Sequence, residues 1–599
     1  MVRRETVRRT LVTMAALFSA ALAAGCVSMP TGGPVQSYPV TQGTVTQNQP
    51  NVQFQPQPPG KGWSPEKIVQ GFLAASASFG DYSQMALKYL TPQEQQVWNY
   101  PTWSAVIYKN GPGVADAVYP TGSAKTAKTA TVKVTGAIQA TLLGSTYSVP
   151  STPADSSSDA PPPFQLVKEP SGQWRISSAP LEVLLTSDSF ADDYQLRNLY
   201  FFDPTGSYLV PDPIYVPLRA PGDLMNGLVQ DLITPPKDWL SGGATKTALP
   251  AGTKIIDVTV DVVTALVNLT GSIAKDGADN ALMEQVSSQL LWTLSGSGQS
   301  GATGAVQSVE VELDGHPWFP PGSQGNSVQQ KNQSQKGPPT GANSLYYYLD
   351  SAGWLTSRQG AAGKPDRIQL IGTGYTQVAV STDGRYLAAL RGSTLYTGLV
   401  GGSLAKRGSG FVTMSWDGND NLWTAQGGQV IMFRVTVTLR RPLGQLVQVA
   451  VEIDSYYGKN LSIPFTALRV APDGVRVALV EDNDLLTFGA ISGQQGPNPL
   501  ITLSQVQLSP QPATAFSGLT WYGPDNVITL AQPGPAATEY PVSGGNPTPI
   551  PVEPGMKTIT ASLGNLLIAG LTDGSIVADA SLTGAWMGLG NGVAPAYPG

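Results

Sequence analysis

The sequence predicts a multi-domain fold in which two mixed α+β domains are followed by an all-β domain. Three observations lead to this prediction. The chain has 599 residues, which is too long for a single hydrophobic core. It contains 66 Gly and 50 Pro but only 13% charged residues, which favours β-rich domains with many turns. Helical apolar spacing occurs in the first half of the chain, whereas the last part repeats a strand-turn-strand pattern.

The first segment has the pattern of a bacterial lipoprotein signal peptide. A positive start with Arg3, Arg4, Arg8 and Arg9 precedes an apolar run from Leu11 to Leu22. This run is too short to span a membrane as a mature helix. Small residues then lead to Cys26, the single cysteine of the chain. In lipoprotein maturation such a thiol receives a diacylglyceryl group and the chain is cut before it. We therefore expect S-diacylglycerol and N-acyl groups, such as palmitate, on Cys26; an ordinary cleaved signal is the alternative.

The predicted lipids and the segment after them place the protein near a membrane surface. Two acyl chains hold a protein firmly, whereas one binds reversibly. No other stretch approaches 18 uninterrupted apolar residues, so we expect an anchored and not a spanning protein. Residues 26–62 are rich in Pro, Gln, Gly and Thr and read as a flexible linker. A coil of this length spans roughly 30–36 Å, which keeps the following domains close to the surface.

The domain at 63–190 is predicted to begin with helices and to continue with strands. Ser64-Pro65 is a helix start, and Thr91 to Glu94 reads as a capping box for a second helix. The predicted strand faces are Ala130, Val132, Val134 and Ile138, then Phe164, Leu166, Trp174 and Ile176. Helices followed by a sheet that ends in Gly-x-Trp-Arg-Ile resemble NTF2-like domains, which implies either a ligand-holding cone or a structural spacer. Residues 151–163 are interpreted as a disordered loop.

The domain at 191–319 is predicted to have the order β-α-β-β-α-β. Its segments are a strand at 199–202 with extended pieces at 208–210, a helix with Leu224, Met225, Leu228, Val229 and Leu232, a strand face of Ile256, Val258, Val260 and Val262, a partner strand with Ala265, Val267 and Leu269, a helix with Leu282, Val286, Leu290 and Leu294, and a strand with Val309, Val311 and Leu313. The stretches 249–254, 267–269 and 306–315 resemble the GerMN domain of spore-germination and cell-envelope proteins. That resemblance implies an α/β domain and transfers no active site.

A polar linker at 320–342 leads to the C-terminal domain at 343–599, which we predict to be a β-propeller. Five strand-turn-strand units recur at 378–390, 412–423, 468–480, 519–530 and 559–571. Each unit leaves room for two more strands before the next, as in four-stranded blades. The pattern therefore indicates five blades, and residues 346–354 add a strand or a sixth blade. A β-sandwich fits this internal repetition poorly.

Most catalytic constellations are absent from the sequence. His316 is the only histidine, which excludes a His-rich metal site, and we expect it in a surface turn. No nucleophile elbow or phosphate-binding loop occurs. Two pairs of carboxylates are close in sequence, Asp417 with Asp420 and Asp482 with Asp484. Each pair could bind calcium, act as an acid pair in catalysis, or only stabilise a turn. Four aromatic residues have two possible roles: they contact a glycan or a protein partner, or they pack between blades. They are Tyr456, Tyr457, Trp521 and Tyr522.

These observations predict a binding protein and not an enzyme. We expect no catalytic, cofactor-binding or metal-binding residues, and the net charge of −6 gives no basic patch for nucleic acid. The order of lipidated cysteine, spacer, NTF2-like domain, GerMN-like domain and propeller is similar to that of the actinobacterial LpqB family of lipoproteins. This resemblance implies a location on the outer, extracytoplasmic face of the cell membrane. It also implies association with the extracytoplasmic domain of the sensor histidine kinase MtrB, whose response regulator is MtrA, and a modulating role in cell-wall homeostasis and division.

Two other functional classes stay open at this point. One is a peptidoglycan-binding or envelope-assembly lipoprotein, in which a domain grips the wall polymer. The other is a propeller hydrolase that uses paired carboxylates about 5 to 9 Å apart.

Overall fold

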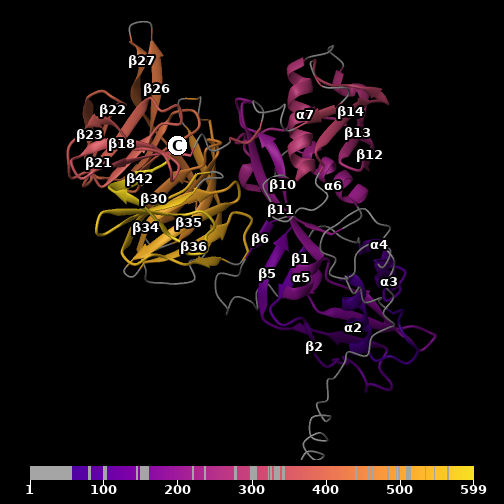
Figure 1. Cartoon of the computed structure of the whole chain (residues 1–599). Coiled ribbons are helices and arrows are strands. Elements are labelled where there is room, and N and C mark those ends of the chain that lie inside the picture. Colours follow the sequence, from indigo (N-terminus) through magenta and orange to yellow (C-terminus); the bar gives the residue numbers. More distant parts are fainter. Residues whose placement is uncertain are drawn as a thin grey trace, which may run out of the picture.

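The computed structural model describes most of the chain from residue 57 to the C-terminal end (Figure 1). The described residues are 57–77, 83–98, 104–143, 146–148, 161–218, 221–234, 236, 238–274, 280–296, 306–321, 323, 327–329, 337–339, 344–438, 441–455, 458–459, 465–481, 485–493, 496, 499–507, 515–532, 535–545, 547–562 and 566–599. Cys26 and the linker up to residue 56 lie outside this part, as do Tyr456, Tyr457, Asp482, Asp484 and residues 151–160.

The first domain packs short helices against curved sheets, as predicted. Its helices are α2 (Pro65–Ser76), α3 (Ser83–Leu87) and α4 (Glu94–Val97). Its strands form the sheets β6-β5-β1-β9 (Thr146–Ser148, Ile138–Leu143, Ala105–Tyr108, Val183–Thr186), β3-β7-β8 (Thr129–Val132, Phe164–Lys168, Trp174–Ser178) and β2-β4 (Gly113–Val114, Val134–Thr135). Ser64 caps α2 by accepting a hydrogen bond from the Lys67 amide, and Pro65 stands at the first position, as expected. The buried face of α2 places Phe72 against Phe164 and Trp98.

Two expectations for this domain are corrected by the structure. The Thr91 hydroxyl accepts a hydrogen bond from the Glu94 amide, but the reciprocal half of the capping box is missing. The Glu94 carboxylate instead accepts from the Ala179 amide, and the Thr91 amide donates to Ile176 in the neighbouring strand. Tertiary partners therefore outcompete the local box, and the helix has only four residues. The predicted strand face from Ala130 to Ile138 is divided among β3, β4 and β5, which belong to three different sheets.

The second domain begins with a two-stranded ribbon and continues as helices on a sheet. The short helix α5 (Ser187–Asp193) leads into the ribbon, whose strands β10 (Tyr194–Phe202) and β11 (Leu209–Pro217) pair over their whole length. The elements that follow are α6 (Pro221–Ile233), η3 (Asp238–Leu240), β12 (Ile255–Asp261), β13 (Thr264–Leu269), η4 (Gly271–Ala274), α7 (Asn280–Ser295), β14 (Ser308–Leu313), β15 (His316–Pro317) and β16 (Ser327–Gln329). The sheet has the order β12-β13-β14-β15, with β16 also paired to β14, and α6 and α7 contribute Leu228, Val286 and Leu290 to its core.

The predicted order of elements is recovered with three differences. The first strand is a separate ribbon and not a member of the sheet. Two residues of the predicted strand face are not buried. Val262 is 86% exposed, because it lies in the β12–β13 turn with a φ of 52°, and Ile256 is 50% exposed at a register shift between Ile255 and Asp257. The strand β16 falls inside the segment predicted as a linker, so part of that segment belongs to the sheet.

The C-terminal domain is a β-propeller, as predicted. In the described part of the chain its strands form six sheets arranged around a common axis (Figure 1). The first three blades, each written from its inner strand outward, are β42-β17-β18-β19 (Val593–Ala596, Leu345–Leu349, Trp354–Gln359, Asp366–Leu370), β20-β21-β22-β23 (Gln377–Val380, Tyr386–Arg391, Thr394–Leu399, Leu404–Gly408) and β24-β25-β26-β27 (Phe411–Trp416, Leu422–Gln426, Gln429–Thr438, Arg441–Ala450).

The other three blades follow the same plan, and the fourth carries two additional strands. They are β30-β31-β32-β33-β28-β29 (Phe465–Val470, Arg476–Glu481, Leu486–Ser492, Leu500–Gln507, Glu452–Ser455, Gly458–Lys459), β34-β35-β36-β37 (Ala515–Tyr522, Asn526–Gln532, Ala536–Pro541, Thr548–Ile550) and β38-β39-β40-β41 (Met556–Thr560, Leu567–Leu571, Ser575–Asp579, Met587–Asn591). The inner strands contact one another in a closed ring, β42 to β20, β24, β30, β34, β38 and back to β42.

The expectation of five blades is therefore one too few. The blade that the hairpin count missed is the one that closes the ring. Its inner strand β42 comes from the C-terminal end of the chain, whereas its partners β17, β18 and β19 begin the domain. Residues 346–354, which the sequence indicated as an added strand or sixth blade, lie in this closing blade.

Among the described helices, none combines the length and the apolar character that a membrane crossing requires.

Candidate functional sites at the domain junction and in the propeller channel

The ribbon β10–β11 joins the first domain through a group of aromatic rings. Phe190 stacks on Tyr194 with ring centroids 4.7 Å apart, and it lies 5.1 Å from Tyr215 on the other ribbon strand. Tyr147 of β6 completes the group at 5.6 Å from Phe190 and 5.4 Å from Tyr215. Because these rings are buried or half-buried, they fix the ribbon to the first domain.

The propeller reaches the same group through one glycine. The Tyr215 hydroxyl donates a hydrogen bond to the Gly544 carbonyl, with 3.4 Å between the oxygens. Gly544 has a φ of +77°, and a Cβ atom at this position would lie 2.3 Å from the Tyr147 carbonyl oxygen. The first domain, the ribbon and the propeller therefore meet at Tyr147, Tyr215 and Gly544.

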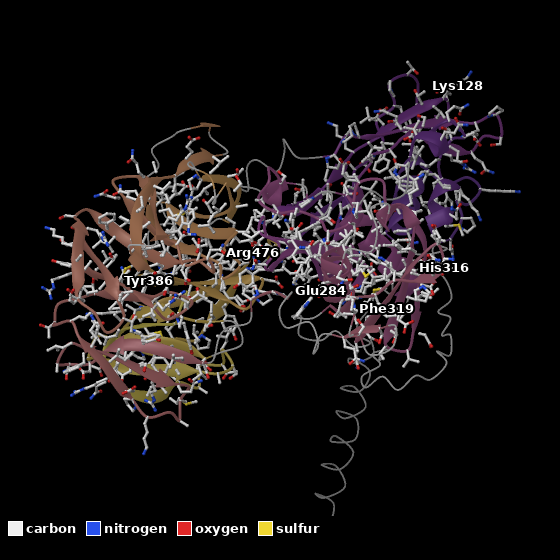
Figure 2. All side chains as sticks on the ribbon, turned by 90° about the horizontal axis from the view of Figure 1, so that it is seen from above. Lys128, Glu284, His316, Phe319, Tyr386 and Arg476 are labelled. Atoms are coloured by element: carbon white, nitrogen blue, oxygen red, sulfur yellow. The ribbon has the colours of Figure 1, made fainter. Side chains whose placement is uncertain are left out.

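Further along the ribbon, polar side chains form a buried contact with the propeller. Asn198 of β10 donates its amide to the Asp525 carboxylate at 2.8 Å, and both side chains are buried. Burial raises the pKa of Asp525, although the Asn198 amide and the Arg476 guanidinium act in the opposite direction. Arg476 itself forms a buried ion pair with Asp473 at 2.7 Å and lies 4.9 Å above the Trp521 ring. Figure 2 shows Arg476 on the side of the propeller that faces the other two domains.

An apolar contact accompanies this polar one. Val210 of β11 and the segment around η3, with Trp239, Leu240 and Ala244, share one hydrophobic cluster with residues of the fourth and fifth blades. The Trp239 indole donates to the Asp212 carboxylate at 3.3 Å, which orients the ring. The second domain and the propeller therefore bury a common core, and the junction joins all three domains into one unit.

The carboxylates that the sequence singled out have structural roles where the structure describes them. Asp417 is fully buried and accepts hydrogen bonds from the amides of Asn419 and Asn421, from the Asn421 side chain and from the Trp423 indole, at 2.8 to 2.9 Å. Asp420 occupies a turn with a φ of +59° and accepts from the Asp383 amide. Burial and the nearby Asp383 carboxylate raise the pKa of Asp420 to about 6. This geometry is that of hydrogen-bonded turns between strands and not of a catalytic pair.

The metal alternative finds no support in the described residues, where no group of three or more His, Cys, Asp and Glu side chains can hold an ion. The second carboxylate pair, Asp482 with Asp484, lies outside those residues.

The remaining candidates from the sequence are placed as follows. Trp521 is buried and donates its indole N–H to the Arg469 carbonyl at 3.0 Å, so it packs between blades and presents no glycan-binding surface. Tyr522 is half-buried against the sixth blade. His316 is exposed in the two-residue strand after the Asp314-Gly315 turn. Figure 2 labels it in the part of the molecule that the first two domains form. Tyr456 and Tyr457 lie outside the described residues.

The propeller axis contains a cavity that sequence reasoning missed. It has a volume of about 90 Å³ and is lined by residues from all six blades, among them Gln377, Met414, Arg469, Ser517, Thr558 and Ala594. Among the described residues of this wall, Arg469 has a charged side chain. A signal for it exists in the sequence, because Arg469 interrupts the otherwise apolar inner strand Ala467-Leu468-Arg469-Val470.

The inner strands around this cavity are tied together by repeated hydrogen bonds. Ser415 accepts from the Val470 amide at 3.1 Å, and Thr520 accepts from the Ala561 amide at 2.9 Å. The first bond joins the third blade to the fourth and the second joins the fifth to the sixth, so side-chain hydrogen bonds connect neighbouring inner strands around the cavity.

Comparison with known proteins assigns the chain to a family. The family model described as Lipoprotein LpqB, N-terminal domain, matches residues 58–191, and the model described as Lipoprotein LpqB beta-propeller domain matches residues 357–598. Between them, residues 198–318 match the model described as Sporulation and spore germination. The Lipoprotein LpqB of Thermobifida fusca is 27% identical over 97% of this chain and 97% of its own length. That of Streptomyces coelicolor is 27% identical over 96% of both chains.

The chain belongs to the LpqB lipoprotein family. The identification agrees with the resemblance that the order of domains indicated. The match to the spore-germination model agrees with the GerMN-like stretches. In this member of the family, Asn198, Val210 and Tyr215 of the ribbon all fall within the segment that matches the spore-germination model. The contacts that the ribbon makes with the propeller therefore come from the central domain, whereas Tyr147 approaches Gly544 from the first domain.

Among solved structures, virginiamycin B lyase from Staphylococcus aureus aligns with 42% of this chain and 85% of its own, at 14% sequence identity and a TM-score of 0.28. A likeness this low carries no argument about activity.

Proposed function

We propose that this LpqB-family lipoprotein is a membrane-anchored accessory protein of a two-component sensor histidine kinase. It acts without catalysis on the extracytoplasmic face of the cell membrane, where it binds the sensor domain of an MtrB-type kinase and modulates signalling to the MtrA regulator. The process served is cell-wall homeostasis and division. The observation that supports the proposal most strongly is the contact among the three domains at Tyr147, Tyr215 and Gly544. This contact makes the three domains one unit that follows the expected tether.

A tether of the kind expected at residues 26–62 favours binding to a membrane-bound partner. Diacylglyceryl and N-acyl groups on Cys26 would hold the protein at the surface. The linker then confines the domains to a shell of about 30–36 Å, which raises their effective concentration toward a neighbouring ectodomain to about the millimolar range. Weak contacts are sufficient for complex formation at such concentrations.

The assembled body is suited to transmit a binding event. Asn198 with Asp525, and Tyr215 with Gly544, tie the ribbon to the propeller, while the rings of Tyr147 and Phe190 tie it to the first domain. A partner that binds one domain therefore acts on the orientation of the other two.

The non-catalytic part of the proposal is supported by the use of the buried carboxylates. Asp417, Asp473 and Asp525 are each engaged with backbone amides, an amide side chain or a guanidinium. A general acid or base needs a carboxyl group that can reach a substrate. These three carboxyl groups are buried, and each accepts at least one hydrogen bond within the fold.

The proposal is tested by crosslinking in living cells. Cells that express the intact protein are compared with cells that express Cys26→Ser, and captured proteins are identified by mass spectrometry. Ser37→Ala, a substitution in the same linker, is the matched control, because it leaves the lipidation site unchanged. We expect the intact protein and Ser37→Ala to capture a sensor histidine kinase and Cys26→Ser to lose most of this capture. Recovery of peptidoglycan or assembly proteins without a kinase would replace the proposal with the wall-binding alternative.

A further inference from the structure

The part of the first domain that follows the expected tether carries an excess of positive charge. The whole chain has a net charge of −6. Within residues 57–76, 115–133 and 164–175, basic residues nevertheless outnumber acidic ones. The basic residues are Lys61, Lys67, Lys125, Lys128, Lys133, Lys168 and Arg175, and the acidic ones are Glu66, Asp116 and Glu169. The local charge is therefore opposite in sign to that of the chain.

Contacts between elements join the segments that carry these lysines. The Lys168 amide donates to the Lys128 carbonyl at 2.8 Å, and the Lys168 ammonium lies 5.6 Å from the centre of the Trp174 ring. The centre of the Trp174 ring is in turn 6.4 Å from that of Tyr119. The strands β3, β7 and β8 and the loop before β3 therefore meet here.

The same contacts continue to the first turn of α2. The Ala117 amide, two residues before Tyr119, donates to the Glu66 carboxylate at 2.9 Å. Next to Glu66, the Lys67 ammonium lies 4.8 Å from the centre of the Trp63 ring. We define the tether-side surface as the exposed residues Lys61, Lys67, Val118, Lys125 and Lys128 together with the half-buried Lys168. Figure 2 labels Lys128 at the end of the first domain that is remote from the propeller.

The chain from the expected lipid anchor reaches the folded body at this surface. The Tyr89 hydroxyl donates to the Gln57 carbonyl at 2.5 Å, and the Tyr89 ring lies 6.5 Å from that of Trp63. Residues 27–56 separate Gln57 from Cys26, and a coil of this length spans roughly 30 Å. The anchor therefore connects the body to the bilayer beside Trp63 and Lys67.

The side chains of this surface combine charge with apolar area. The ion pairs found among the described residues include none of its lysines. The acidic residue among them, Glu66, accepts the Ala117 amide. Val118 is 62% exposed, and the Trp63 ring is half-buried. Lysines with long apolar stems beside a tryptophan are typical of protein surfaces that contact the polar region of a membrane.

We propose that the tether-side surface binds the anionic headgroups of the bilayer in which Cys26 is anchored. Ammonium groups are attracted to lipid phosphates, and each lysine near an anionic surface strengthens binding by about fivefold. This attraction acts over about 8 Å at physiological ionic strength, a separation that the tether permits. In the bound orientation the first domain lies on the membrane and the propeller is directed away from it. The inference does not depend on a kinase partner.

Cosedimentation of the full mature chain with lipid vesicles tests the proposal. The protein carries Cys26→Ser, which removes the acyl groups, so that only the folded surface contributes to binding. Vesicles of phosphatidylglycerol and phosphatidylcholine in equal parts are compared with vesicles of phosphatidylcholine alone. We expect binding to the anionic vesicles that weakens as salt is added, and far weaker binding to the neutral vesicles.

A pair of substitutions locates the binding surface. In the same background, Lys67→Gln combined with Lys128→Gln should weaken binding to the anionic vesicles by roughly tenfold to thirtyfold. Lys406→Gln combined with Lys557→Gln is the matched control, because it removes the same charge from exposed positions of the propeller. This control should bind like the parent protein. All four lysines are exposed, so neither pair should change the denaturant midpoint of unfolding.

Three results would overturn the proposal. The first is absence of binding to the anionic vesicles at low salt, and the second is equal binding to anionic and neutral vesicles. The third is an equal loss of binding in the two double variants, which would show a response to net charge and not to this surface. Retention on purified peptidoglycan together with the first result would identify the wall polymer, and not the membrane, as the partner of these lysines.

Discussion

Replacement of Gly544 by Ala should open the contact between the propeller and the first domain. Two costs add at this residue. A φ of +77° is unfavourable for a residue with a side chain, by roughly 1–2 kcal/mol. The new Cβ would also lie 2.3 Å from the Tyr147 carbonyl oxygen, and overpacking of this kind costs about 1–3 kcal/mol. The total is therefore about 2–5 kcal/mol.

Gly523→Ala separates these two costs. Gly523 lies in a turn of the same blade with a φ of +66°, and nothing lies within 4 Å of its Cβ position. This control should therefore lose only the backbone part, about 1–2 kcal/mol. The difference between the two variants, roughly 1–3 kcal/mol, measures the contact with Tyr147.

Hydrogen exchange measured by mass spectrometry on the full chain provides the assay. Because β6 is an edge strand of its sheet, it can move away from Gly544 while the rest of the first domain stays folded. We expect faster exchange in residues 146–148 and in the strand β11 in Gly544→Ala, with unchanged exchange there in Gly523→Ala. Equal exchange at β6 in both variants would refute the conclusion that the three domains meet at this point.

Two further predictions concern the turns of the propeller. Asp417→Ala leaves the Asn421 amide and the Trp423 indole without an acceptor in a buried site, so the free energy of unfolding should fall by about 2–4 kcal/mol in denaturant titrations. Asp573→Ala, in an exposed turn, should change it far less, and equal losses would contradict the role given to Asp417. For Asp420, the pKa of about 6 lies above that of an unfolded chain, near 4, so the folded state keeps its proton between these values while the unfolded state loses it. The contribution of Asp420 to the free energy of unfolding is therefore full below about pH 4 and is lost as the pH rises through about 6. The variant Asp420→Asn should be more stable than the wild type at pH 7.5 but not at pH 3.5. A stability difference that stays constant across this pH range would count against the assignment.

Much of the fold was predictable because its signals are local. The caps at Ser64, the apolar stripes of α6 and α7, and the alternation in β13 depend on neighbours in sequence, and the structure contains them where expected. The turns of the propeller were recognisable for the same reason. Val262 shows the limit, since its place after an alternating strand gave no sign of the positive φ that moves it into the turn.

The features that could not be predicted depend on residues far apart in the chain. The closing blade combines strands from the two ends of the domain, so a count of local hairpins finds one blade too few. Asn198 and Asp525 are 327 residues apart, and neither has a local signature for the contact that they form. The cavity on the propeller axis is lined by residues from all six inner strands, so no local pattern shows that these residues meet. Periodicity identifies the face of each strand but not which faces meet.

The most direct test of the proposed function is a reconstitution with the kinase. A full-length MtrB-type kinase is placed in liposomes with the lipidated protein, with the Cys26→Ser protein at the same bulk concentration, or with neither. Phosphorylation of MtrA is then followed over time. The account predicts that the lipidated protein changes the rate and that the unlipidated form has a much smaller effect, because only the anchored form is concentrated at the membrane surface. A rate that stays the same in all three conditions, with the lipidated protein shown to be bound to the liposomes, would contradict the account.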